Sequence, residues 1–71
     1  MPFVSIRIVR EAIASDPAAK KAAIAEKVVG AISEATGLGK SEVWVVFEEI
    51  AARDWYVGPS SAEKMRQAAA E

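Results

Sequence analysis

The 71-residue sequence contains no histidine and no cysteine. These two side chains perform most proton transfer and nucleophilic attack near neutral pH. Their absence excludes a disulfide, and a structural zinc site would depend on carboxylates alone, which is uncommon. A chain this short buries a small fraction of its surface, and 52% hydrophobic residues are more than one small core can hide. We therefore expect a single domain, residues 1–71, that is stable as a homo-oligomer.

The sequence also lacks a block of positive charge. Its nine lysines and arginines are spread along a chain of net charge -1, which argues against a nucleic-acid partner. The longest apolar run, residues 43–47, is far shorter than the roughly 20 residues of a membrane-spanning helix, so we expect no membrane association. No basic region followed by a long apolar stretch opens the chain, so we expect a cytoplasmic protein.

Two apolar segments and one amphipathic segment define the expected fold. Residues 3–9 alternate as a strand does, with Val4, Ile6 and Ile8 on the face that should meet a helix. The helix should span residues 17–36, and its apolar stripe comprises Ile24, Val28, Ile32 and Ala35. Residues 42–50 read as a second strand, and their nearly continuous apolar run suggests burial on both faces.

The ends of the helix carry local signals. Asp16 can cap the first free amides and Pro17 suits the first helical position, while Gly37 is a good left-handed cap at the other end. Residues 10–15 are expected to form a loop. Strand, helix and strand then make a β-α-β unit of the α/β (α+β) class, and the crossover makes the two strands parallel.

The remainder of the chain is less regular in its pattern. Residues 51–61 read as an irregular segment with a turn at Gly58-Pro59. Trp55 and Tyr56 in this segment are either packing anchors or the walls of a pocket. Ser60 or Ser61 can cap a last short helix over residues 62–69.

Pro2 is the candidate base. If Met1 is removed, Pro2 becomes a free secondary amine, whose reference pKa is roughly 7.7–8.0. Burial in an apolar pocket lowers that pKa because it disfavours the cation, so the amine would be neutral at working pH. If Met1 stays attached, the nitrogen is an amide and has no useful basicity. Met-Pro opens many unrelated proteins, so this dipeptide alone is a weak signal.

Several segments in order resemble the 4-oxalocrotonate tautomerase family. They are Met1-Pro2, Ala31-Ile32-Ser33 in the helix, residues 43–49 in the second strand, and residues 54–58 after it. The resemblance covers the chain from Pro2 to about Ser61. It implies a protomer that dimerises into a four-stranded sheet backed by helices, with three dimers usually forming a homohexamer.

The resemblance also implies an isomerase that uses no metal and no organic cofactor. Its chemistry is proton transfer at carbon in a small carboxylate substrate, a 2-hydroxy-dienoate or an enol-pyruvate acid, as in aromatic degradation. Pro2 matches the catalytic base of the family. Trp55 falls at or near the aromatic residue that closes the pocket, where its bulk would exclude water.

The arginines of the family match less well. The family's arginine near the start of the second strand falls on Trp44, so one cation is missing. Arg10 takes the place of the other arginine with altered spacing, and Arg7 and Arg53 are possible substitutes. If Arg7 does not bind an anionic ligand, its side chain is expected to be exposed to solvent or to lie at a subunit interface. Loss of one charge-assisted contact costs about 1.5–3 kcal/mol, so a mono-acid enol fits better than a dicarboxylate.

Two other functions remain open at this point. The chain could be a non-catalytic oligomeric subunit that keeps the fold, which the replacement of arginine by Trp44 favours. It could also be a hydratase or dehalogenase of the same superfamily. Those enzymes need a residue that activates water, for which Glu49 or Asp54 can be nominated, although strand-end carboxylates are more often solvated surface groups.

Overall fold

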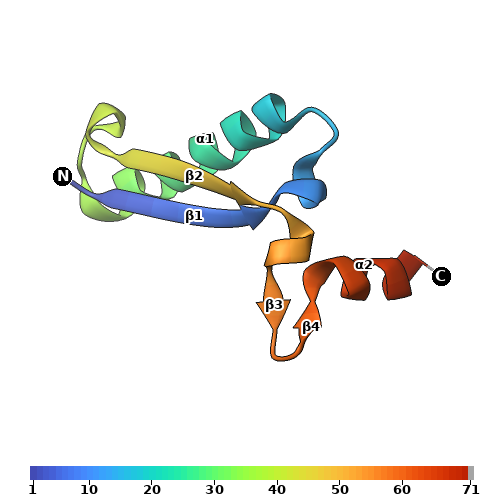
Figure 1. The fold of residues 1–71 in the computed structure, drawn as a ribbon. Helices are drawn as coiled ribbons and strands as arrows, with labels where there is room; N and C mark the ends of the chain where they lie inside the picture. The colour runs from blue at the N-terminus through green and yellow to red at the C-terminus, as the bar shows by residue number, and fades with distance from the viewer. Residues whose placement is uncertain (71) are drawn as a thin grey trace.

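A parallel pair of strands packed against one long helix forms the centre of the structure (Figure 1). The computed structural model describes residues 1–70. Strand β1 (Phe3–Val9) pairs with β2 (Trp44–Ile50), in a register that runs from Phe3 opposite Trp44 to Val9 opposite Ile50. Helix α1 (Pro17–Thr36) connects them. The predicted β-α-β unit with parallel strands is confirmed.

Local capping sets the ends of α1 where the sequence predicts them. The Asp16 carboxylate accepts a hydrogen bond from the Ala19 amide at 3.3 Å, and Asp16 itself has a left-handed backbone with φ 56°. Gly37 ends the helix with φ 79°, and its amide donates to the Ser33 carbonyl at 2.8 Å. Glycine adopts this conformation without the steric cost that a side chain would add.

Two connecting segments differ from the prediction. The expected loop over residues 10–15 contains a 3₁₀ helix, η1 (Arg10–Ile13). The second strand begins at Trp44 rather than at Glu42, because Glu42 ends another 3₁₀ helix, η2 (Lys40–Glu42). The Glu42 carboxylate accepts a hydrogen bond from the Gly39 amide at 3.0 Å, and this contact favours the tight turn over an extended start of the strand.

The segment after β2 is more regular than predicted. Its elements are η3 (Ala52–Asp54), β3 (Tyr56–Val57), β4 (Ser60–Ser61) and α2 (Ala62–Ala70). The β3–β4 hairpin turns at Gly58, whose φ is 64°, and projects beyond the ends of β1 and β2 (Figure 1). The Ser61 hydroxyl accepts a hydrogen bond from the Lys64 amide at 3.2 Å, which confirms the predicted serine cap.

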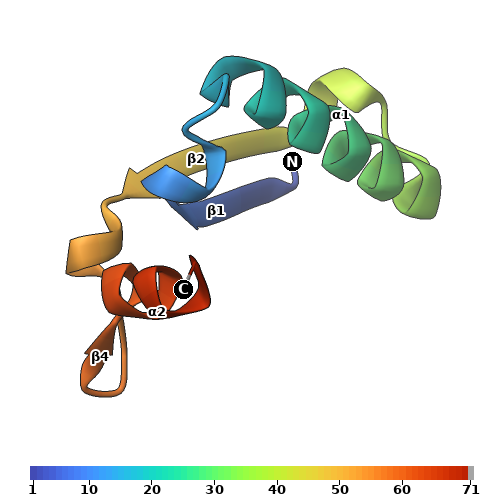
Figure 2. The same cartoon turned by 90° about the vertical axis from the view of Figure 1, so that its right-hand side faces the viewer.

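Helix α1 covers one face of the strand pair and leaves the other open (Figure 2). Val4, Ile6 and Ile8 are half-buried, as expected for the helix-facing side. On the opposite face, Phe3 is 61% exposed and Trp44 is 54% exposed. Within residues 1–70, a single chain thus leaves this second face open, and burial of β2 on both faces, as the sequence predicts, would need another subunit to cover it.

The protomer has a small core. Among the described residues, the buried apolar side chains are Ile13, Val43, Ala51 and Ala52. Ile24, Val28 and Ile32 of α1 are half-buried, whereas Ala35 is exposed in the last turn and does not join the apolar stripe. No helix within residues 1–70 is both long enough and apolar enough to cross a membrane.

Candidate active site

A cavity of about 240 Å³ lies where β2 runs into η3. We call it the Trp55 cavity, and its walls are Arg7, Ile50, Asp54, Trp55 and Tyr56. It brings together four residues that the sequence analysis singled out: Arg7 and Trp55 for substrate binding, Tyr56 as a possible pocket wall and Asp54 as a possible activator of water. Arg7 lies on the open face of the sheet, and its Nε donates to Glu48 Oε2 at 3.3 Å across the strand pair. A guanidinium has five N–H donors, so this contact leaves donors for an anionic ligand.

Main-chain hydrogen bonds on both sides hold Trp55 in place. Its amide donates to the Ala52 carbonyl at 3.3 Å, and its carbonyl accepts from the Ala62 amide at 2.6 Å. The side chain is half-buried, unlike that of Tyr56, which is 63% exposed. Trp55 can therefore act as a fixed apolar wall that limits the access of water to the cavity.

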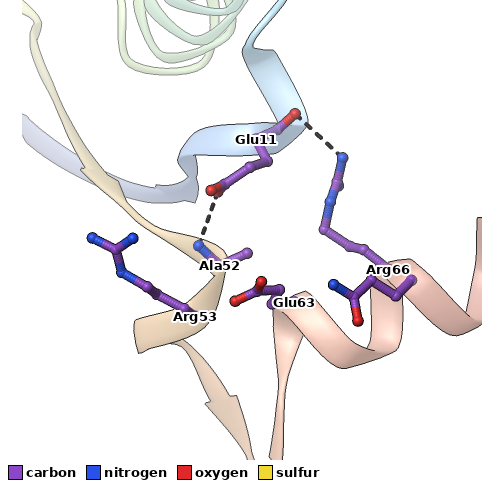
Figure 3. A pocket seen from close by; sticks show the side chains of 6 residues that line it. Glu11, Ala52, Arg53, Glu63 and Arg66 are labelled. Atoms are coloured by element: carbon purple, nitrogen blue, oxygen red, sulfur yellow. Dashed lines mark hydrogen bonds between the residues drawn. The ribbon is translucent and has the colours of Figure 1, made fainter.

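Glu11 and helix α2 border a second cavity, of about 350 Å³. We call it the Glu11 cavity (Figure 3). The Glu11 carboxylate accepts a hydrogen bond from the Ala52 amide at 2.8 Å, and this bond lowers the pKa of the Glu11 carboxyl. Arg66 donates to the Glu11 carbonyl at 3.2 Å. These contacts fasten η1 to η3 and to α2.

The arginines of the Glu11 cavity do not form a clamp. Arg53, a possible substitute for a missing family arginine, lines this cavity together with Arg66. In Figure 3 the Arg66 side chain extends up to the Glu11 carbonyl, whereas the Arg53 guanidinium lies at the left of the view, so the two do not converge on one point. Bidentate recognition of one carboxylate needs donors that converge on it. The arrangement of Arg53 and Arg66 does not provide this.

Arg10 belongs to a cluster of three charges on the helix side of the sheet. Its Nε lies 3.7 Å from Glu49 Oε1, while Lys21 of α1 donates to Glu49 Oε2. The Glu49 side chain is 28% exposed. Both oxygens of Glu49 thus face a cation, and this pairing argues against Glu49 as the carboxylate that activates water.

Pro2 lies at the other end of the sheet. It is half-buried, and its carbonyl accepts a hydrogen bond from the Trp44 amide at 3.0 Å. Arg7, the β1 residue that lines the Trp55 cavity, lies five residues along the strand from Pro2, which at about 3.3 Å per residue is roughly 16 Å. One protomer therefore holds Arg7 and Trp55 in one cavity, Arg10 in the charge cluster, and Pro2 at a distance from both.

Sequence patterns carry no signal for the long-range partners of these residues. The pairing of Arg7 with Glu48 follows from the register of two strands that are 41 residues apart. Strand alternation places both residues on one face, but the register is needed to set them opposite each other. Within residues 1–70, no group of three or more carboxylate side chains is placed to hold a metal ion.

Comparison with known proteins identifies the family. The family model described as tautomerase enzyme matches residues 2–65, which is most of the chain and begins at Pro2. No curated protein and no solved structure matches the chain significantly. The matched range includes the strand pair, α1, all the residues that line the Trp55 cavity and the β3–β4 hairpin. The chain belongs to the tautomerase enzyme family.

Proposed function

We propose that the chain is a cofactor-independent keto-enol tautomerase of the 4-oxalocrotonate tautomerase type, with Pro2 as the general base once Met1 is removed. The observation that carries the proposal is that the family match begins at Pro2. In a sequence without histidine or cysteine, the amine of Pro2 is the group whose reference pKa is nearest to neutral. The proposed substrates are small enol acids or 2-hydroxy-dienoates.

The surroundings of Pro2 suit this role. Met1 is 83% exposed, so a processing enzyme can reach it. The hydrogen bond from Trp44 to the Pro2 carbonyl ties the residue to β2 and fixes where the amine would point. A base held in one position gains from orientation, because the reacting atoms need not search for each other.

The proposed reaction conserves every proton. The neutral Pro2 amine removes the proton from the enol hydroxyl of the substrate, and the oxygen keeps the electron pair of the broken O–H bond. The resulting enolate is stabilised by a cation or a hydrogen-bond donor at that oxygen. The prolinium then delivers the proton to a carbon of the enolate, and the oxygen becomes the carbonyl of the product. No oxidant, reductant or cofactor is consumed.

A complete site requires more than one protomer. Pro2 and the Trp55 cavity lie at opposite ends of β1, and the two-stranded sheet leaves each strand with one unpaired edge within the described residues. If two copies pair these edges in antiparallel fashion, Pro2 of one copy comes next to the far end of the strand of the other. We propose a homo-oligomer built in this way, a hexamer as the resemblance implies.

The open sheet face supports the same assembly. Phe3, Trp44 and Val46 are 61%, 54% and 45% exposed and lie on one face of adjacent strands. Large apolar side chains gathered on one face mark an interaction surface. Trp44, which stands where the family has an arginine, is therefore proposed as an interface residue.

The position of Asp54 favours a second candidate function, that of a hydratase or dehalogenase. It lines the Trp55 cavity with Arg7, and a carboxylate there is placed to activate water in a hydratase or dehalogenase. A screen of Asp54→Asn with 3-haloacrylates separates the two activities. Under our proposal this variant keeps its tautomerase activity, and the wild type releases no halide.

The test of the proposal is the Pro2→Ala variant. We expect the ketonisation of phenylenolpyruvate and of 2-hydroxymuconate, followed by ultraviolet absorbance, to fall by about 10²–10⁴-fold, the usual contribution of a general base. Light scattering should show an unchanged oligomer. Full activity of Pro2→Ala would exclude Pro2 as the base. An inactive wild type that lacks Met1 and assembles normally would instead identify a non-catalytic subunit.

A further inference from the structure

Tyr56 occupies an unusual position beside the candidate site. It follows Trp55 directly and lines the Trp55 cavity together with Arg7. Its side chain is 63% exposed, more than that of any other aromatic residue in the described chain. Packing within the protomer therefore does not explain why a tyrosine stands here.

The backbone around Tyr56 is well fixed. Tyr56 pairs with Ser61 in the β3–β4 hairpin, and Ser61 is buried and caps α2. On the other side, the Trp55 carbonyl accepts the Ala62 amide at 2.6 Å. The phenol is thus carried by an ordered element whose two ends are hydrogen-bonded. A group held in this way can serve as a preorganised donor.

The charges of the cavity define what it can bind. Arg7 is its one cationic side chain and Asp54 its one carboxylate. Arg7 already shares its Nε with Glu48. One guanidinium can bind one carboxylate group, so the cavity suits a ligand with a single carboxylate. A second carboxylate would meet Asp54 without a cation to balance it.

The enolate oxygen of such a ligand needs a donor of its own. Once Arg7 binds the carboxylate, the side-chain donors that remain in the cavity are the Trp55 indole N–H and the Tyr56 hydroxyl. The Trp55 side chain is the half-buried wall, whereas Tyr56 is open to an entering molecule. A neutral phenol is a known donor to enolate oxygens in isomerase sites.

We propose that Tyr56 is a catalytic residue of this site, whose hydroxyl donates a hydrogen bond to the enol oxygen of a monocarboxylate substrate while that oxygen is an enolate. The inference rests on the proposed function and adds to it a donor and a substrate preference. No proton is transferred by Tyr56 in this role. The hydroxyl supplies the stabilisation at oxygen for which no second arginine is present in the cavity.

The experiment compares Tyr56→Phe with Ser60→Ala in the full-length protein without Met1. The first variant removes only the phenolic oxygen and keeps the ring, so a role of the ring in subunit contacts is preserved. The second removes a hydroxyl from the same hairpin outside the cavity. With phenylenolpyruvate, we expect kcat of Tyr56→Phe to fall by about a hundred-fold, the usual effect of losing one oxyanion donor, with KM changed far less. Ser60→Ala should match the wild type.

Pro2→Ala, measured alongside, separates this inference from the proposed function. If Pro2→Ala is inactive and Tyr56→Phe equals the wild type, the role of Tyr56 is refuted and Pro2 as the base is retained. If the wild type without Met1 has no activity, the proposed function itself fails and the role of Tyr56 fails with it.

Discussion

The substitution Glu49→Gln examines the charge cluster that joins α1, β2 and η1. Glutamine keeps the size of the side chain and removes the negative charge that faces Lys21 and Arg10. The side chains of Glu49 and Lys21 are 28% and 30% exposed, so solvent screens their interaction only in part. Arg10 is 57% exposed and contributes less.

The expected magnitude lies between two known limits. Breaking a fully buried ion pair costs about 3–5 kcal/mol, and an exposed pair contributes about 0.2–1 kcal/mol. For the partly exposed pair of Glu49 and Lys21, we expect the free energy of unfolding to fall by about 1–2 kcal/mol, between these limits. In a domain of this length, each kcal/mol lowers Tm by about 4–8 °C.

Urea unfolding followed by circular dichroism measures this effect at one fixed protein concentration, since the proposed assembly would make stability depend on concentration. The matched control is Glu48→Gln, one residue earlier, because Glu48 and its partner Arg7 are 57% and 68% exposed. We expect the control to lose less stability than Glu49→Gln. A double-mutant cycle with Lys21→Met should give a clear coupling energy. Equal losses in the two glutamine variants, or zero coupling, would refute the reasoning.

Three further outcomes are expected. Trp44→Lys places a charge on the open sheet face, so light scattering should show a smaller assembly, and an unchanged mass would contradict the proposed interface. Trp55→Ala removes the wall of the Trp55 cavity and should lower kcat/KM by at least ten-fold in the enol assay, whereas an unchanged value would exclude Trp55 from the site. The hydrogen bond from the Ala52 amide lowers the pKa of the Glu11 carboxyl in the folded state. This hydrogen bond therefore stabilises the fold at pH values above the pKa that Glu11 has in the unfolded chain, and the stabilisation is lost as the pH falls through the pKa that Glu11 has in the folded state. Unfolding of Glu11→Gln should therefore depend less on pH below about pH 4.3 than that of the wild type, and parallel curves would exclude this contribution.

The parts of the fold that depend on local chemistry were predictable. Helix α1 begins after Asp16 and ends before Gly37, as its sequence indicates, because both caps act on neighbouring residues. The alternation in β1 likewise gave the correct buried face. Each signal is contained in a few consecutive residues and needs no knowledge of the rest of the chain.

The parts that depend on distant residues were not predictable. The two-residue strands β3 and β4 are too short to show a period, and only the turn at Gly58 was visible. The pairing of Arg10 with Glu49 joins segments 39 positions apart, so the nomination of Arg10 for substrate binding took no account of this competing anion. For β2, the apolar run predicted burial on both faces, with another subunit covering the second face, but it could not indicate which surface of that subunit would do so; in a single chain Trp44 and Val46 on this face are exposed.

The most direct test of the central proposal compares Pro2 as an amine with Pro2 as an amide. Intact mass identifies which molecules of the untagged protein have lost Met1, and expression with methionine removal inhibited provides the Met1-retaining form. The two forms differ in this one residue, so the comparison isolates the basicity of the nitrogen. We predict that the Met1-free form ketonises phenylenolpyruvate and that the Met1-retaining form does not. Equal rates for the two forms would contradict Pro2 as the base.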